Sequence, residues 1–195
     1  MDLVNMLARW GHLLFGMTWI GLLYYFNFIQ GGYFKSATPE GLKDAKAKLA
    51  PEALWWFRWG AMFTFLTGLV LLAGVGKMHV MNDFIVVGAA LGTLMFMNVW
   101  MIIWPNQKIA LGIVEGDAAA AGPKALLASR TNVLFSGPMA FCMMAGPHFG
   151  GYGMGVGSTA MWIALAIVAA LFINGLKGKQ GPMTTVRGVI VSSLV

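Results

Sequence analysis

Two of the three histidines in the chain lie near the ends of long apolar segments. His12 lies near the start of the segment RWGHLLFGMTWIGLLYYFNF at 9–28, and His148 follows Pro147 near the end of another. Neutral imidazole is the commonest metal ligand, and an ionisable group at membrane depth is costly enough to indicate a functional site. Two imidazoles on facing helices can hold the iron of a b-type haem. We therefore expect His12 and His148 to be haem-iron ligands.

The helical face that carries His12 also offers room for a flat group. At helical spacing, His12, Gly16 and Trp19 share one face. Gly16 has no side chain to block a porphyrin beside the imidazole, and Trp19 would supply an apolar wall. We therefore expect Gly16 and Trp19 to belong to the same cofactor-binding site. His79, in a short turn, is expected to be a solvated residue.

Copper is a second possibility for this chemistry. Residues with sulfur or imidazole groups gather in the segments 78–81 and 142–148. Thioether and thiolate ligands suit Cu(I), but most of the 15 methionines lie in apolar segments, where methionine usually serves packing. Haem is therefore favoured over copper. The catalytic residues stay unknown, because neither a Ser-His-Asp arrangement nor a pair of intramembrane carboxylates is visible.

The elements that must position these residues are membrane helices. Of the 195 residues, 58% are hydrophobic and 10% are charged, whereas soluble domains carry about 25% charged residues. The sequence predicts an all-α fold, a polytopic bundle of about five transmembrane helices in a single domain, residues 1–195. The predicted spans are about 10–31, 55–76, 84–104, 132–147 and 159–176. Polar residues inside the spans, such as Asn27 and Asn98, are expected to join helices.

The distribution of charge predicts how the bundle is oriented. The net charge of +6 does not indicate nucleic-acid binding, because the basic residues lie in short loops between apolar segments. The loops 32–54 and 106–131 and the C-terminal tail hold most of them, and the opposite side holds only Arg9 and Lys77. Since positively charged loops stay in the cytoplasm, we predict an N-terminus outside and a cytoplasmic C-terminus. We expect loop 106–131 to be a flexible connector.

Four sequence blocks resemble consecutive parts of one membrane domain: RWGHLLFGMTWIGLLYYFNF at 9–28, LWWFRWGAMFTFLTGLVLL at 54–72, VGAALGTLMFMNVWMIIWPNQKI at 87–109 and SRTNVLFSGPMAFCMMAGPHF at 129–149. This domain is the N-terminal domain of the bacterial membrane-bound urate oxidases of the PuuD type. The WPNQ block at 104–107 and the HxxxGxxWIG block at 12–21 are the most distinctive. The resemblance implies a helical domain of the bacterial inner membrane that takes part in urate oxidation and passes electrons to the respiratory chain.

The chain also departs from the pattern of that family. Cys142 is its one cysteine, so the sequence has no CxxCH motif for c-type haem. Val86 and Thr131 stand where the pattern has histidines, whereas His12 and His148 match histidines of the family.

Two functional hypotheses follow from these residues. The first is a membrane redox subunit that binds b-type haem and exchanges electrons with a c-type cytochrome or a quinone. If this chain is an enzyme, the resemblance implies an oxidoreductase of the urate oxidase type. The alternative is a non-catalytic accessory subunit of a larger membrane complex. In both cases the expected partners are membrane lipid and other membrane subunits, and not nucleic acid.

Overall fold

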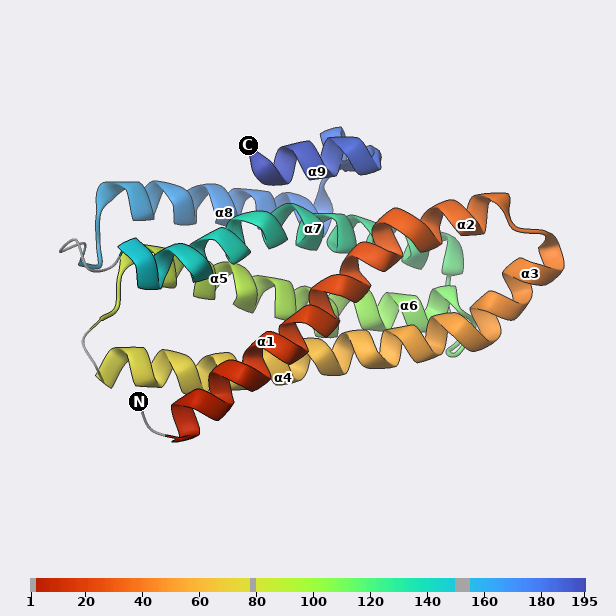
Figure 1. Cartoon of the computed structure of the whole chain (residues 1–195). Helices are drawn as coiled ribbons and strands as arrows, with labels where there is room; N and C mark the ends of the chain where they lie inside the picture. Colours follow the sequence, from red (N-terminus) through yellow and green to blue (C-terminus); the bar gives the residue numbers. More distant parts are fainter. Residues whose placement is uncertain (1–2, 78–79, 150–154) are drawn as a thin grey trace.

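The long helices of the chain run back and forth along one axis, except the first, which crosses the others obliquely (Figure 1). A computed structural model describes residues 3–77, 80–149 and 155–195, and all regular secondary structure in these ranges is helical. The predicted all-α fold is therefore confirmed. The long helices are α1 (Leu3–Tyr24), α4 (Ala50–Lys77), α5 (Asp83–Met97), α7 (Ala118–Phe149) and α8 (Thr159–Lys177).

Short helical pieces extend these long helices. Three of them are π-helical turns: η1 (Tyr25–Gln30) after α1, η2 (Ala45–Leu49) before α4, and η3 (Asn98–Ile103) after α5. The others are α2 (Gly31–Ser36), α3 (Pro39–Asp44), α6 (Trp104–Ala110), η5 (Gly181–Thr184) and α9 (Val186–Leu194). Helix thus runs almost without interruption from α1 to α4. Thr38 caps the start of α3 by accepting a hydrogen bond from the backbone N–H of Gly41 at 3.2 Å.

Four helical stretches of the described chain are long and apolar enough to cross a bilayer. They are Leu3–Ser36, Pro39–Gly76, Asp83–Ala110 and Thr159–Lys177. These stretches indicate a membrane protein. Apolar side chains on α8, including Trp162, Ile163 and Ile167, are more than half exposed, as expected of a surface that faces lipid.

Helix α7, the fourth predicted span, lies at the centre of the bundle. It contacts α1, α5, α6, α8 and α9, and every residue from Ala128 to Ser136 is buried. Protein rather than lipid surrounds the helix at this depth, so its outer face does not need to be apolar. This explains why α7 is less apolar than the other long helices and is not among the four candidate spans.

Buried amides join α5 and η3 to α7. The Nδ2 amide of Asn98 donates to Oδ1 of Asn132 at 2.8 Å, and Nδ2 of Asn132 donates to the carbonyl oxygen of Met95 at 2.9 Å. Asn98 is 1% exposed and Asn132 is fully buried. These bonds satisfy polar groups that would otherwise destabilise the packed helices, and they confirm that Asn98 joins helices.

Two further bonds fasten the end of α1 to α7. The Tyr24 hydroxyl lies 2.8 Å from Oγ of Ser136, and Nδ2 of Asn27 donates to Oγ of Ser129 at 2.7 Å. From this crossing, the N-terminal half of α1 runs along α4 and away from α7 (Figure 1). The prediction that Asn27 joins helices is confirmed.

The predicted loop before α7 was wrong, whereas the predicted span at 132–147 lies within the longer helix α7. The flexible connector expected over 106–131 is reduced to residues 111–117, since α6 ends at Ala110 and α7 begins at Ala118. Oδ1 of Asp117 accepts hydrogen bonds from the backbone N–H groups of Ala119 and Ala120 at 2.9 and 3.2 Å. This cap starts the helix, and the alanines that follow continue it because alanine has the best helix propensity.

Prolines within α7 do not interrupt the helix, and the tail of the chain supplies one reason. The hydroxyl of Ser193 in α9 donates to the carbonyl oxygen of Val133 at 3.1 Å and accepts from the backbone N–H of Gly137 at 3.2 Å. These bonds lie directly before Pro138, where the helical ladder loses a donor. The C-terminal tail therefore folds back against α7.

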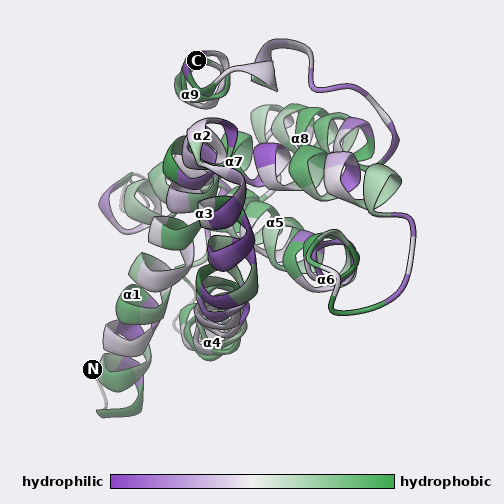
Figure 2. Ribbon diagram, turned by 90° about the vertical axis from the view of Figure 1, so that its right-hand side faces the viewer, coloured by the Kyte–Doolittle hydropathy of each residue, from purple (hydrophilic) through white to green (hydrophobic). Residues whose placement is uncertain are grey.

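The segments that carry most of the basic residues lie at one end of the bundle. The loops between α1 and α4 and between α6 and α7 meet at the end where α2 and α3 lie (Figure 1). Figure 2 views the molecule from this end and shows hydrophilic residues on α3 and at the adjoining start of α4. Nearby, Trp55, Trp59 and Trp100 form ring contacts at 6.4 and 5.7 Å between centroids.

Replacing Asn132 should destabilise the bundle. In the variant Asn132→Leu, Nδ2 of Asn98 and the carbonyl oxygen of Met95 lose their partners, and we expect a loss of about 1–2 kcal/mol in unfolding free energy. Unfolding in detergent micelles, followed by circular dichroism, measures this change.

The control is Asn174→Leu, since Asn174 bonds only locally to Lys179 at an exposed site. Equal effects of the two substitutions would contradict a special role for the buried amides. Adding Asn98→Leu to Asn132→Leu should recover part of the loss, because no unpaired amide then remains.

Candidate functional site

His12 lies in the interface between α1 and α4. Its Nδ1 lies 2.9 Å from the carbonyl oxygen of Thr64 and 3.2 Å from Oγ1 of Thr67. Because a carbonyl only accepts hydrogen bonds, Nδ1 carries the proton in the neutral ring, and Nε2 carries the lone pair. Gly68 gives the ring room, since a Cβ at that position would lie 3.1 Å from Cε1 of His12. The imidazole is therefore held at a fixed angle by bonds to Nδ1, and Nε2 is not used in them.

Gly16 and Trp19 lie on the same side of α1 as His12, as the helical spacing predicted. A Cβ on Gly16 would lie 3.9 Å from Cγ2 of Thr64, and Trp19 is 2% exposed within the apolar core. Both residues therefore take part in the packing of α1 on α4. Their predicted roles in a haem site, Gly16 as clearance for a porphyrin and Trp19 as an apolar wall, stay predictions.

His148 lies in the last turn of α7 and is exposed. Its Nδ1 donates to the carbonyl oxygen of Met144 at 2.7 Å, so its Nε2 also carries the lone pair. The structure thus brings His12, Gly16 and Trp19 together against α4 but places His148 on a helix end that diverges from α1 (Figure 1). His79 lies outside the described residues.

Each of the two histidines, considered separately, has the hydrogen-bonding arrangement that suits a haem-iron ligand. In both cases a backbone carbonyl fixes the protonated nitrogen and leaves Nε2 for a metal, which is the usual arrangement of a ligating histidine. Within the described ranges, no group of three or more His, Cys, Asp or Glu side chains is placed to hold a metal ion. Any metal ligation by these residues would therefore use one or two imidazoles.

A cavity of about 240 Å³ lies at the other end of α1. It is lined by residues of η1, α2, η2, α4, α6 and α7, and two π-helical turns border it, a feature frequent at functional sites. Its lining combines aromatic and polar side chains, among them Phe26, Asn27, Gln30, Lys46, Gln107 and Ser129. The cavity therefore joins residues from the blocks at 9–28, 87–109 and 129–149.

Arg130 follows Ser129 of the cavity lining in the sequence and is 8% exposed. Its Nη2 is 3.5 Å from the carbonyl oxygen of Asn27, and its Nε and Nη1 have no hydrogen-bond partner in the described part of the protein. The one ion pair among the described residues joins Lys48 to Asp44 at 2.6 Å. Arg130 is thus a buried cation that no described carboxylate pairs with.

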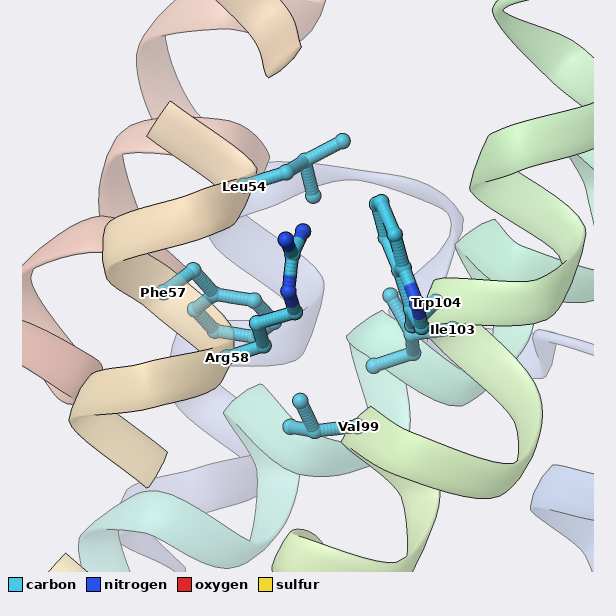
Figure 3. Close-up of a pocket in the computed structure, with 6 residues that line it drawn as sticks. All are labelled: Leu54, Phe57, Arg58, Val99, Ile103 and Trp104. Carbon is cyan, nitrogen blue, oxygen red and sulfur yellow. The ribbon is translucent and has the colours of Figure 1, made fainter. Parts of the chain in front are cut away.

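A second hollow, too narrow to admit a water molecule, lies between α4 and the η3–α6 segment (Figure 3). Arg58 extends along the ring of Trp104 there, with its guanidinium carbon 3.8 Å from the ring centroid. The rest of the lining is apolar: Leu54, Phe57, Val99 and Ile103. Arg58 is held by a cation–π contact, which indicates a structural role rather than a binding site.

The chain matches the family described as urate oxidase N-terminal over residues 77–177, just over half of its length. The chain belongs to this family. No curated protein and no solved structure matched it. The matched region of the urate oxidase N-terminal family runs from the end of α4 to the end of α8. It includes Gln107, Ser129, Arg130 and His148, whereas His12, Gly16 and Trp19 lie before it.

Sequence reasoning did not identify the polar cavity. It assigned Arg130 to a basic loop and Asn27 to helix joining, and it gave no role to Gln30 or Ser129. The available signal was the SRTN block at 129–132, where a charge and three polar residues directly precede an apolar run. Such a cluster is costly at membrane depth and indicates either a network or a ligand.

A bulky residue at Gly60 should disrupt the interface that holds His12. A Cβ there would approach the backbone nitrogen of Trp19 to 3.2 Å, and that backbone has little freedom to move. We expect Gly60→Val to lower the unfolding free energy by roughly 1–3 kcal/mol, measured by unfolding in detergent. The matched control is Gly92→Val, because a Cβ on Gly92 meets nothing within 4 Å. A loss of the same size in both variants would refute close packing at Gly60.

Proposed function

We propose that this member of the urate oxidase N-terminal family is a membrane redox subunit that binds a b-type haem through Nε2 of His12. The single observation that supports this most is the anchoring of Nδ1 by Thr64 and Thr67, which fixes the ring and leaves Nε2 available. A bound haem would supply one-electron chemistry. The residues of this chain contribute the fixed imidazole and, through the packing of α4, its orientation.

His148 is proposed as the second iron ligand on the same grounds. Its Nδ1 is bonded to a backbone carbonyl, and its exposed position at the end of α7 leaves Nε2 accessible. Since α7 diverges from α1 toward this end, His12 and His148 are tested separately. Copper ligation by these residues is the less favoured form of the same proposal.

The proposed setting is the bacterial inner membrane, with the N-terminus outside and the C-terminus in the cytoplasm. The gathering of basic segments at the end of α2 and α3 supports this orientation. The proposed electron partner is a c-type cytochrome or a quinone that meets the end of the bundle nearer His12. Lipid and other membrane subunits would cover the exposed apolar side chains of α8.

A second candidate function is a non-catalytic accessory subunit of a larger membrane complex. The observation that favours it is the use of Gly16 and Trp19 in the packing of α1 on α4, a role that requires no porphyrin. In that case His12 would serve the α1–α4 interface alone, through its bond to Thr64.

The haem proposal predicts an absorption spectrum. Protein purified in detergent should show a Soret band that shifts on reduction and reoxidation, and His12→Ala should abolish it because the fixed ligand is gone. The substitution His148→Ala should change the band or its reduction potential, since one axial ligand is replaced. Absorption spectroscopy with redox titration and metal analysis measures these effects.

The control for folding is Thr18→Ala, because the Thr18 hydroxyl bonds only to the Leu14 carbonyl on its own helix. This variant should keep the full Soret band. Folded protein without haem, together with copurifying subunits that survive His12→Ala, would instead establish the accessory role. Copper in stoichiometric amount would overturn the haem assignment.

A further inference from the structure

The cavity at the end of α1 lies close to the level where the helices leave the bilayer. Its lining includes residues of η1, of the first turns of α4 and of the second half of α6. Along the helical stretch that begins at Asp83, Gln107 lies roughly 36 Å from the start at 1.5 Å per residue, and the hydrocarbon core is about 30 Å thick. Trp55, the residue after Leu54 of the lining, belongs to a tryptophan cluster typical of the membrane interface. The cavity therefore lies at the depth of the lipid head groups.

The charge at the cavity is positive. Lys46 belongs to the lining, and within the described part of the chain no carboxylate does. The guanidinium of Arg130 adds to this charge, because its Nη2 lies 3.5 Å from the carbonyl oxygen of Asn27, another lining residue, and no described carboxylate pairs with it. Two such cations favour an anionic ligand, and at head-group depth the phosphate of an anionic lipid is such a ligand.

The rest of the lining suits a ligand that is polar at one end and apolar at the other. Phe34, Leu111 and Leu126 supply apolar walls. Leu126 is 42% exposed, so this apolar wall continues to the outer surface of the bundle. Gln30 adds an amide whose Oε1 has no hydrogen-bond partner among the described residues, and an unpaired acceptor of this kind favours a ligand with hydroxyl donors. The volume of about 240 Å³ admits a small head group but not the acyl chains of a lipid.

We propose that this cavity binds the head group of an anionic phospholipid of the phosphatidylglycerol type. Lys46 attracts the phosphate together with Arg130, Gln30 accepts from a glycerol hydroxyl, and the acyl chains leave past Leu126 into the bilayer. Basic pockets between membrane helices are a recurrent form of lipid recognition. A lipid bound there contacts α4, α6 and α7 at once and stabilises their junction. The proposal does not rest on haem binding at His12.

Counting bound lipids tests the proposal. The full chain, delipidated in a neutral detergent, is titrated with phosphatidylglycerol or with phosphatidylcholine, and native mass spectrometry measures how many molecules bind and how tightly. We expect one saturable phosphatidylglycerol, bound at least about fivefold more tightly than phosphatidylcholine, because a single basic residue near the membrane surface changes lipid affinity by about that factor. Equal affinities for the two lipids would overturn the proposal.

Two pairs of variants test the location. Lys46→Gln removes the charge from the lining and should weaken phosphatidylglycerol about fivefold, whereas Lys43→Gln, at an exposed lysine outside the lining, should not. Ala110→Phe fills the cavity without changing its charge and should also weaken the lipid, whereas Ala119→Phe, at an exposed site outside the lining, should not. Circular dichroism confirms that each variant is folded. Undiminished binding to folded Lys46→Gln or Ala110→Phe would show that the lipid binds elsewhere, and the proposal would fail.

The soluble head group distinguishes a lipid from a free phosphate diester. Glycerophosphoglycerol carries the same phosphate and hydroxyl groups as phosphatidylglycerol but has no acyl chains. We expect it to bind at least about tenfold more weakly, since the apolar contacts of the chains with the outer surface of the bundle are lost. Equal affinity would mean that the cavity takes a soluble phosphate diester, and the lipid assignment would be wrong.

Discussion

The enclosure of α7 between Ala128 and Ser136 is the constraint on which the rest of the bundle depends. This segment carries polar side chains that would be costly in an apolar interior without partners. Several of the partners come from neighbouring helices. The carbonyl of Met95 in α5 and the amide of Asn98 in η3 pair with Asn132, and α9 pairs with the backbone around Gly137. The hydrogen bonds of one helix thus determine which helices surround it.

The same segment determines where α1 is fixed and where it departs from the centre. Asn27 and Tyr24 tie its far end to α7, so the half that carries His12 is left to pack on α4. Glycines at this second interface allow close approach, and Gly60 lies directly against the backbone of Trp19. The result is two separate regions of polar chemistry, one around an imidazole and one around a polar cavity.

The π-helical turns connect this packing to the cavity. Turn η1 carries Asn27 and Gln30, and η3 carries Asn98 and leads into the WPNQ block. A π-helical turn changes the direction in which the following side chains point. Asn27 consequently reaches Ser129 with its nitrogen and leaves its oxygen beside the cavity. One amide both joins two helices and lines the cavity.

The sequence by itself determined the helical class, the membrane character, the family resemblance and the helix-joining role of Asn27 and Asn98. These follow from local properties: apolar length, charge spacing and residue type. Tertiary structure alone decided that α7 is central, that Gly16 and Trp19 pack on α4, and that Arg130 lies buried beside Asn27. Each of these depends on which helices become neighbours. That choice is made by contacts between residues far apart in the chain, such as Asn27 and Ser129, which no local pattern of apolar residues or charge contains.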